Sequence, residues 1–151
     1  MLKKGLLALL CLSFLIASCR RVPAGANVVL TGEPAAGLVS VEATGQGGNF
    51  PEMEQNALRK TFETILFVGL PSAATTAYRQ PMTDARQFSA ADLDQFFRQE
   101  QHRPFVVQSR RFTGRRRTAA GGRSLRFAFT INHEALRRHL EQRGLIRPFG
   151  Y

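Results

Sequence analysis

The clearest structural pattern in this chain is the stretch LRFAFTI at Leu125–Ile131. Apolar residues alternate there with polar or small ones, so the apolar side chains share one face of an extended strand. Asn132 follows as a helix N-cap, and apolar residues then recur at helical spacing over residues 133–143. Gly144 marks the end of this helix. The stretch therefore predicts a half-buried strand that leads directly into a helix.

The segment before this strand predicts its partner. Phe105–Val107 opens a second extended run that reaches about Phe112. Residues 114–122 between the two runs are basic and rich in turn-forming residues. Two extended runs joined in this way are typical of an antiparallel hairpin.

The N-terminal half predicts a strand followed by a long helix. Residues 38–44 alternate in character and contain β-branched residues, and residues 45–48 (GQGG) are typical of a flexible turn. A helix is expected from Phe50 to about Val68, ended by a glycine and a proline. Its apolar stripe consists of Ala57, Leu58, Thr61, Phe62, Ile65 and Leu66.

Residues 71–88 are expected to form a long loop. Ser89 and Asp92 then resemble a capping box, which predicts a helix that ends before Pro104. The order of elements is β-α-α-β-β-α, with no internal repeat. We therefore expect an α+β domain in which a small antiparallel sheet has its helices packed on one face.

The N-terminus is typical of a bacterial lipoprotein signal peptide. Lys3 and Lys4 precede an apolar run that is too short to span a bilayer, and the string LIASC ends at Cys19. We expect removal of residues 1–18 and attachment of fatty acyl chains, palmitate among them, to Cys19. An ordinary signal peptide or an uncleaved anchor is the alternative. Residues 19–37 would be a lipid-anchored linker, in which residues 28–30 could form a short edge strand, and residues 38–151 a single domain.

The residues after Cys19 bear on location. Arg20 and Arg21 stand where an aspartate would retain a Gram-negative lipoprotein at the inner membrane. The absence of an aspartate favours the outer membrane, with the domain facing the periplasm. Such a location makes cytoplasmic nucleic acid an unsuitable partner.

The sequence contains no catalytic constellation. Both cysteines lie within the first 19 residues, so the domain has no thiol nucleophile or cysteine metal site. His133-Glu134 begins like a zinc-protease helix, but Arg137 stands where that motif needs its second histidine. We therefore expect no enzyme activity, no metal and no cofactor.

Positive charge is concentrated near the C-terminus. Residues 98–151 contain thirteen arginines and only three acidic residues. Such a cluster could bind lipid headgroups, cell-wall polymers or another anionic ligand, or it could be an ordinary solvated surface. The tentative anion-binding set around the hairpin is Arg110, Arg111, Arg115, Arg116, Arg117 and Arg123.

Three segments carry a family resemblance. They are VSVEATG at Val39–Gly45, residues 57–71 ending in TILFVGLP, and the C-terminal pieces ALR at Ala135–Arg137, LE at Leu140–Glu141, GLIR at Gly144–Arg147 and FG at Phe149–Gly150. In these the chain resembles a class of small, uncharacterised Gram-negative envelope lipoproteins. Its strand-then-helix opening is similar to the N-terminal domain of flagellar assembly protein T and related surface lipoproteins. The resemblance implies a structural or assembly role with an envelope protein partner, and it transfers no functional residue except the lipidated cysteine.

Overall fold

The computed structural model describes residues 28–72, 78–83, 88–114, 116–117 and 122–146. Within these ranges no helix is both long enough and apolar enough to cross a membrane. The predicted signal peptide and Cys19 lie outside the described residues, as does the end of the chain after Ile146.

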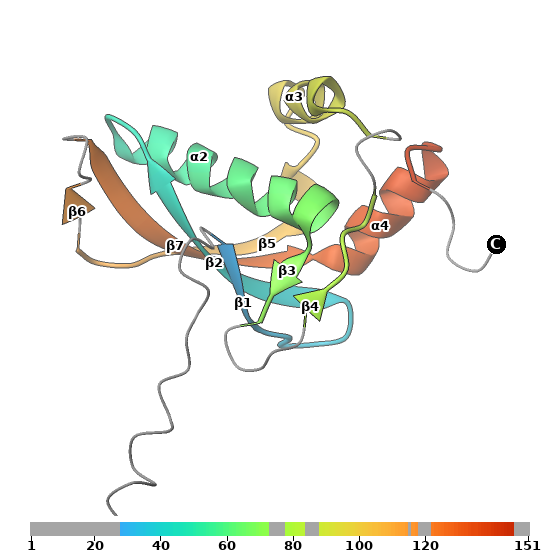
Figure 1. The fold of residues 1–151 in the computed structure, drawn as a ribbon, viewed down its shortest axis with the longest axis horizontal. Coiled ribbons are helices and arrows are strands. Elements are labelled where there is room, and N and C mark those ends of the chain that lie inside the picture. The colour runs from blue at the N-terminus through green and yellow to red at the C-terminus, as the bar shows by residue number, and fades with distance from the viewer. Residues whose placement is uncertain (1–27, 73–77, 84–87, 115, 118–121, 147–151) are drawn as a thin grey trace, which may run out of the picture.

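An antiparallel sheet forms one layer of the molecule (Figure 1). Its strand order is β1-β2-β7-β5, and the short strand β6 pairs with β7 beyond the end of β5. Strands β2 and β7 form the centre over nine paired residues, with Val41 opposite Phe129. The strands are β1 Val28–Gly32, β2 Leu38–Gln46, β5 Val106–Arg111, β6 Arg116–Arg117 and β7 Arg123–Asn132.

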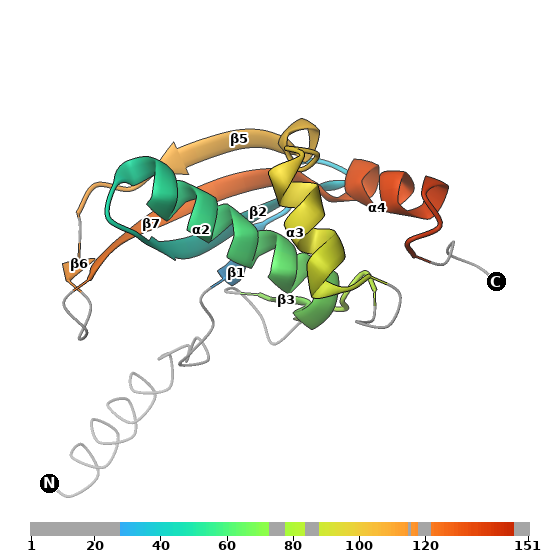
Figure 2. The ribbon, with the colours of Figure 1, turned by 90° about the horizontal axis from the view of Figure 1, so that it is seen from above.

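Three helices pack against this sheet, so the predicted α+β architecture is confirmed. Helix α2 runs along the sheet. Helix α3 lies beside α2 and is inclined to it, and α4 extends from the end of β7 (Figure 2). Their bounds are α2 Phe50–Glu63, α3 Ala90–Arg98 and α4 His133–Gln142. A 3₁₀ turn, Arg103–Phe105, joins α3 to β5, and a two-residue ladder pairs β3 Leu70–Pro71 with β4 Tyr78–Arg79.

The core lies between the sheet and the helices. Alternate residues of the two central strands, such as Val41 and Phe129, are almost fully buried there. Phe62 of α2 is also fully buried and contacts the rings of Phe96 and Phe97 in α3 at 5.8 and 5.6 Å between centroids. Tilted and edge-on packing of this kind adds to the stabilisation from burial. Aromatic packing therefore holds α3 against α2.

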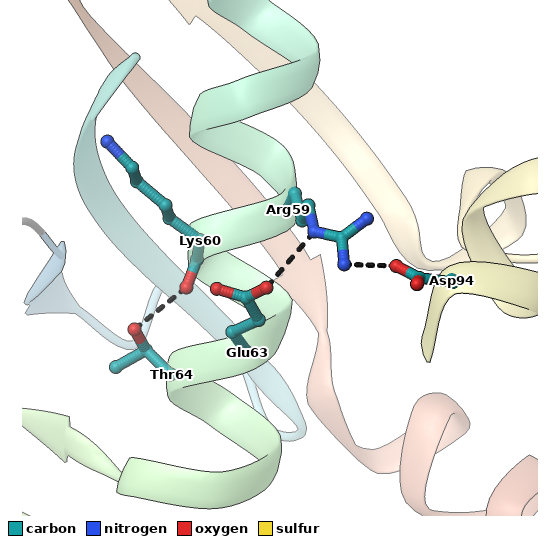
Figure 3. Close-up of polar contacts among 5 residues, drawn as sticks. All are labelled: Arg59, Lys60, Glu63, Thr64 and Asp94. Carbon is teal, nitrogen blue, oxygen red and sulfur yellow. Dashed lines mark hydrogen bonds and ion pairs between the residues drawn. The ribbon is translucent and has the colours of Figure 1, made fainter. Parts of the chain in front are cut away.

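Polar contacts join the same two helices at their surface. Figure 3 shows the Arg59 guanidinium of α2 donating both to Glu63, one turn along α2 at 3.1 Å, and to Asp94 of α3. All three side chains are more than a third exposed, so these ion pairs contribute little compared with the buried rings.

Several local predictions need correction. The possible edge strand at residues 28–30 is confirmed, since Val28–Gly32 pairs with β2 at the margin of the sheet, but it is two residues longer than expected. Gly45 and Gln46 belong to β2 and not to the turn after it. The predicted helix does reach Val68, but its last five residues form a π-helical turn, in which the Gly69 amide donates to the Thr64 carbonyl at 2.6 Å. The predicted loop at residues 71–88 includes strand β4.

Both predicted N-caps are confirmed. Ser89 accepts from the Asp92 amide, and the Asp92 carboxylate accepts from the Ser89 amide, which completes the capping box. Asn132 caps α4 by accepting from the Ala135 amide at 2.9 Å. Because each cap satisfies an orphan donor of the first turn, these helices begin where the sequence indicated.

Candidate functional site

The basic hairpin that the sequence singles out is described in part. Arg115 lies outside the described residues, and so does Cys19. The backbone of β6 places Arg116 opposite Ser124 and Arg117 opposite Arg123 in β7. The two ends of the basic segment therefore meet at one end of β7.

Arg110 lies on the face of the sheet opposite the helices. It pairs in register with Ala128, and the neighbouring outward position of β7 is Arg126. Both guanidinium groups lie over the ring of Phe112, at 5.4 Å for Arg110 and 4.6 Å for Arg126. Cation–π contact at an exposed site positions the two cations at little cost in solvation. The result is a pair of arginines held against one aromatic ring.

Arg126 was missing from the predicted set of arginines. The alternation in Leu125–Ile131 already directs its side chain outward, so the signal was present in the sequence. What the sequence could not reveal is the contact with Phe112, which depends on the hydrogen bond from the Phe112 amide to the Arg126 carbonyl at 3.0 Å. Arg126 also forms an ion pair with Glu42 of β2 at 3.3 Å.

Arg111 faces the other side of the sheet. It pairs in register with Phe127, and its guanidinium lies 4.6 Å from the ring centroid of Phe50 at the start of α2. Arg110 and Arg111 are adjacent in sequence and therefore point to opposite faces of the strand. The predicted arginines thus do not share one patch in the described part of the chain. Arg123 is exposed at the far end of β7.

A hollow lies next to the paired arginines. It measures about 350 Å³ and is lined by Thr44, Phe112, Thr113 and Arg126, among others. Hydroxyl groups and a guanidinium at one surface site can donate hydrogen bonds to an anionic oxygen. We call the surface formed by Arg110, Phe112 and Arg126 the arginine face.

The described histidines and carboxylates do not form a cluster of metal ligands. No group of three or more potential metal ligands occurs in the described residues. Burial, with Arg79 and Arg137 nearby, lowers the pKa of His133 to about 4, so this histidine is neutral at neutral pH. Glu52 accepts from the Gly48 amide at 2.8 Å, and Glu54 accepts from Ser109 of β5. These carboxylates therefore have structural contacts, Glu52 at the start of α2 and Glu54 between α2 and β5.

Comparison with known proteins gives no relative: no family model, no curated protein and no solved structure matches this chain. The resemblance to envelope lipoproteins and to the flagellar assembly domain therefore stays a prediction.

Proposed function

We propose that this protein is a non-enzymatic lipoprotein of the bacterial envelope with a structural or assembly role. One observation carries the proposal: Cys19 follows small residues and an apolar run behind two lysines. Its lipid chains would hold the domain at a membrane. The preferred location is the outer membrane, with the domain facing the periplasm. Several acyl chains anchor a protein firmly, whereas a single chain binds reversibly.

The proposed anchor lies close to the folded domain. Strand β1 begins at Val28, only nine residues after Cys19. A chain of that length spans at most about 30 Å when fully extended. The proposal therefore keeps the sheet within about one domain diameter of the membrane surface, where a fixed partner of the envelope can be reached.

The test compares two cysteine substitutions. Cys19→Ala should release the protein from the membrane fraction, whereas Cys11→Ala, a matched control inside the predicted signal peptide, should leave it there. Mild cross-linking of the wild type should recover one recurrent protein partner. Membrane association that survives Cys19→Ala would contradict the lipid anchor.

A second function, the binding of anionic ligands, is favoured by the arginine face. Arg110 and Arg126 are fixed beside Phe112 on a side of the sheet that no described helix covers. Guanidinium groups bind phosphate and carboxylate through paired hydrogen bonds. A domain tethered near a bilayer would meet such groups on lipid headgroups and cell-wall polymers.

Vesicle binding tests this second function. The chain from residue 20 keeps every described contact and lacks the lipid, so any binding would come from the domain. It should sediment with vesicles of anionic lipid at low salt and dissociate as salt screens the charges. Arg110→Gln with Arg126→Gln should abolish this binding, whereas Arg98→Gln with Arg138→Gln, which removes equal charge from exposed helix positions, should leave it. An equal loss of vesicle binding in both double variants would mean that only the net charge of the domain matters.

A further inference from the structure

The two layers of the molecule carry opposite charge. The five strands of the main sheet contain six arginines and one acidic residue, Glu42, which gives a net charge of +5. Helices α2 and α3, which lie on one side of the sheet in Figure 1, contain five acidic and three basic residues, a net charge of −2. Such a separation of charge orients a domain with its positive side toward an anionic surface. The sheet is therefore the side that an anionic partner would meet.

The outer face of the sheet, opposite the helices, presents two of these arginines. Arg110 and Arg126 belong to the arginine face, and the neighbouring outward positions are mostly neutral. Among them are Ser40 and Thr130, whose hydroxyl groups lie 3.4 Å apart. The carboxylate of Glu42 is also on this face, but it is paired with Arg126 at 3.3 Å. A flat face with two positioned guanidinium groups suits a layer of phosphate groups.

The chain enters the sheet in the same row as the arginine face. Val28, the first residue of β1, pairs with Ala43 of β2, and Ala43 pairs with Phe127 of β7. Phe127 is adjacent in the chain to Arg126. The start of β1 is therefore two strands away from Arg126, a distance of about 10 Å at the usual spacing of strands.

A lipid on Cys19 would keep the arginine face beside its own bilayer. The nine residues from Cys19 to Val28 span at most about 30 Å, which is longer than the gap between Val28 and Arg126. The outer face can therefore lie on headgroups while the anchor is inserted. A short tether raises the effective concentration of the second contact to the order of millimolar, so a contact that is weak in the free domain becomes populated.

We propose that the arginine face binds the anionic headgroups of the bilayer that holds the lipid anchor, so that the outer face of the sheet lies on the membrane and α2 and α3 point away from it. This proposal narrows the anion binding proposed above to one source, the phospholipids on the anchored side. It rests on the proposed lipid anchor for the location, whereas the orientation follows from the charges and from the point at which the chain enters the sheet.

The test uses the chain that begins at Cys19, with this thiol coupled to a maleimide phospholipid in nanodiscs. The chemical anchor makes the result independent of lipidation in the cell. A nitroxide on the lipid headgroups broadens the NMR signals of nearby backbone amides, and the effect falls with the sixth power of distance. Because packed layers lie about 10 Å apart, nanodiscs with phosphatidylglycerol should broaden Gln108 and Ala128 of the sheet at least threefold more than Ala91 and Gln95 of α3. In nanodiscs of phosphatidylcholine alone, this difference should fall at least twofold.

Variants with opposite expected effects complete the test. Arg110→Gln with Arg126→Gln should remove the difference in broadening, whereas Arg98→Gln with Arg138→Gln, which removes equal charge from exposed helix positions, should retain it. Glu42→Gln removes the one acidic residue of the strands and frees Arg126, so the difference should persist to a higher salt concentration than in the wild type.

Four outcomes decide the proposal. Equal broadening of the sheet and α3 in phosphatidylglycerol nanodiscs, or an undiminished difference in phosphatidylcholine, would overturn it. Capture of separate phosphatidylglycerol vesicles, with no orientation on the anchored bilayer, would assign the arginine face to a second membrane and overturn it. Loss of the difference on addition of soluble peptidoglycan fragments at micromolar concentration would overturn the phospholipid source in favour of a cell-wall polymer. Orientation of the chemically anchored chain together with an unlipidated Cys19 in cells would support the arginine face and count against the natural anchor alone.

Discussion

Gly45 of β2 lies directly against the main chain of Met53 in α2: a Cβ at residue 45 would stand 1.8 Å from the Met53 carbonyl oxygen. The absence of a side chain is what allows the helix to approach the strand this closely. We predict that Gly45→Ala destabilises the fold by about 1–3 kcal/mol or more, since a packed core resists added volume. Urea unfolding of the variant measures this.

Gly32 provides the matched control. It lies in β1, and a Cβ there meets nothing within 4 Å. Gly32→Ala should therefore change the free energy of unfolding by less than about 0.5 kcal/mol. Equal losses at residues 32 and 45 would contradict the contact with α2 as the cause of the effect.

The close approach of α2 to Gly45 could not be predicted from the sequence. The strands of the hairpin and the start of α2 follow from periodicity and capping, which are local. The role of Gly45 depends on a contact between two elements, and a glycine-rich string looks the same in a turn and under a helix. Arg110 and Arg111 are a different case: both were assigned to one cluster, although the alternation of side chains along a strand already sends adjacent residues to opposite faces. The hollow between α2 and β5 could not be predicted from the sequence, because its lining residues, which include Leu58, His102 and Ser109, come from three separate segments.

Helices α3 and α4 both end in a Schellman motif, whose left-handed residue is Glu100 (φ 54°) in α3 and Gly144 (φ 67°) in α4. The two motifs predict opposite effects at these equivalent positions. Gly144→Ala should cost about 1 kcal/mol, because alanine is strained at positive φ. Glu100→Gly should be neutral or stabilising by up to about 1 kcal/mol, since relief of that strain exceeds the loss of an exposed ion pair with Arg103. Thermal unfolding of both variants decides this, and a large loss from Glu100→Gly would show that the carboxylate stabilises the fold.

Aromatic packing, and not the ion pairs of Arg59, should determine how firmly α3 is held. Phe62→Ala removes a fully buried ring and should cost about 3–5 kcal/mol. Arg59→Gln should cost less than about 1 kcal/mol, because its pairs with Glu63 and Asp94 are partly exposed. Denaturant unfolding measures both. A larger loss for Arg59→Gln than for Phe62→Ala would reverse this ranking.

Stability should fall as the solution becomes acidic. Burial lowers the pKa of His133 to about 4, below the ordinary value of 6.5, so between these values the unfolded chain binds more protons than the folded one. The contribution of His133 is therefore fully present above pH 6.5 and is lost as the pH falls through 4. The pKa values of His102 and His139 are also lowered by burial and act in the same direction.

His133→Gln isolates one part of this effect. The variant should show a shallower loss of stability between pH 6.5 and 4 than the wild type, measured as the urea midpoint at each pH. A wild-type stability that rises on acidification through this range would contradict the assignment of neutral, buried histidines.

The central claim is the lipid anchor, and mass spectrometry of the protein purified from membranes of the producing cell tests it most directly. The account predicts that the chain begins at Cys19 and that this residue carries the mass of a diacylglyceryl group, with or without a further acyl chain. A chain that begins at another residue, or at an unmodified Cys19, would contradict the claim.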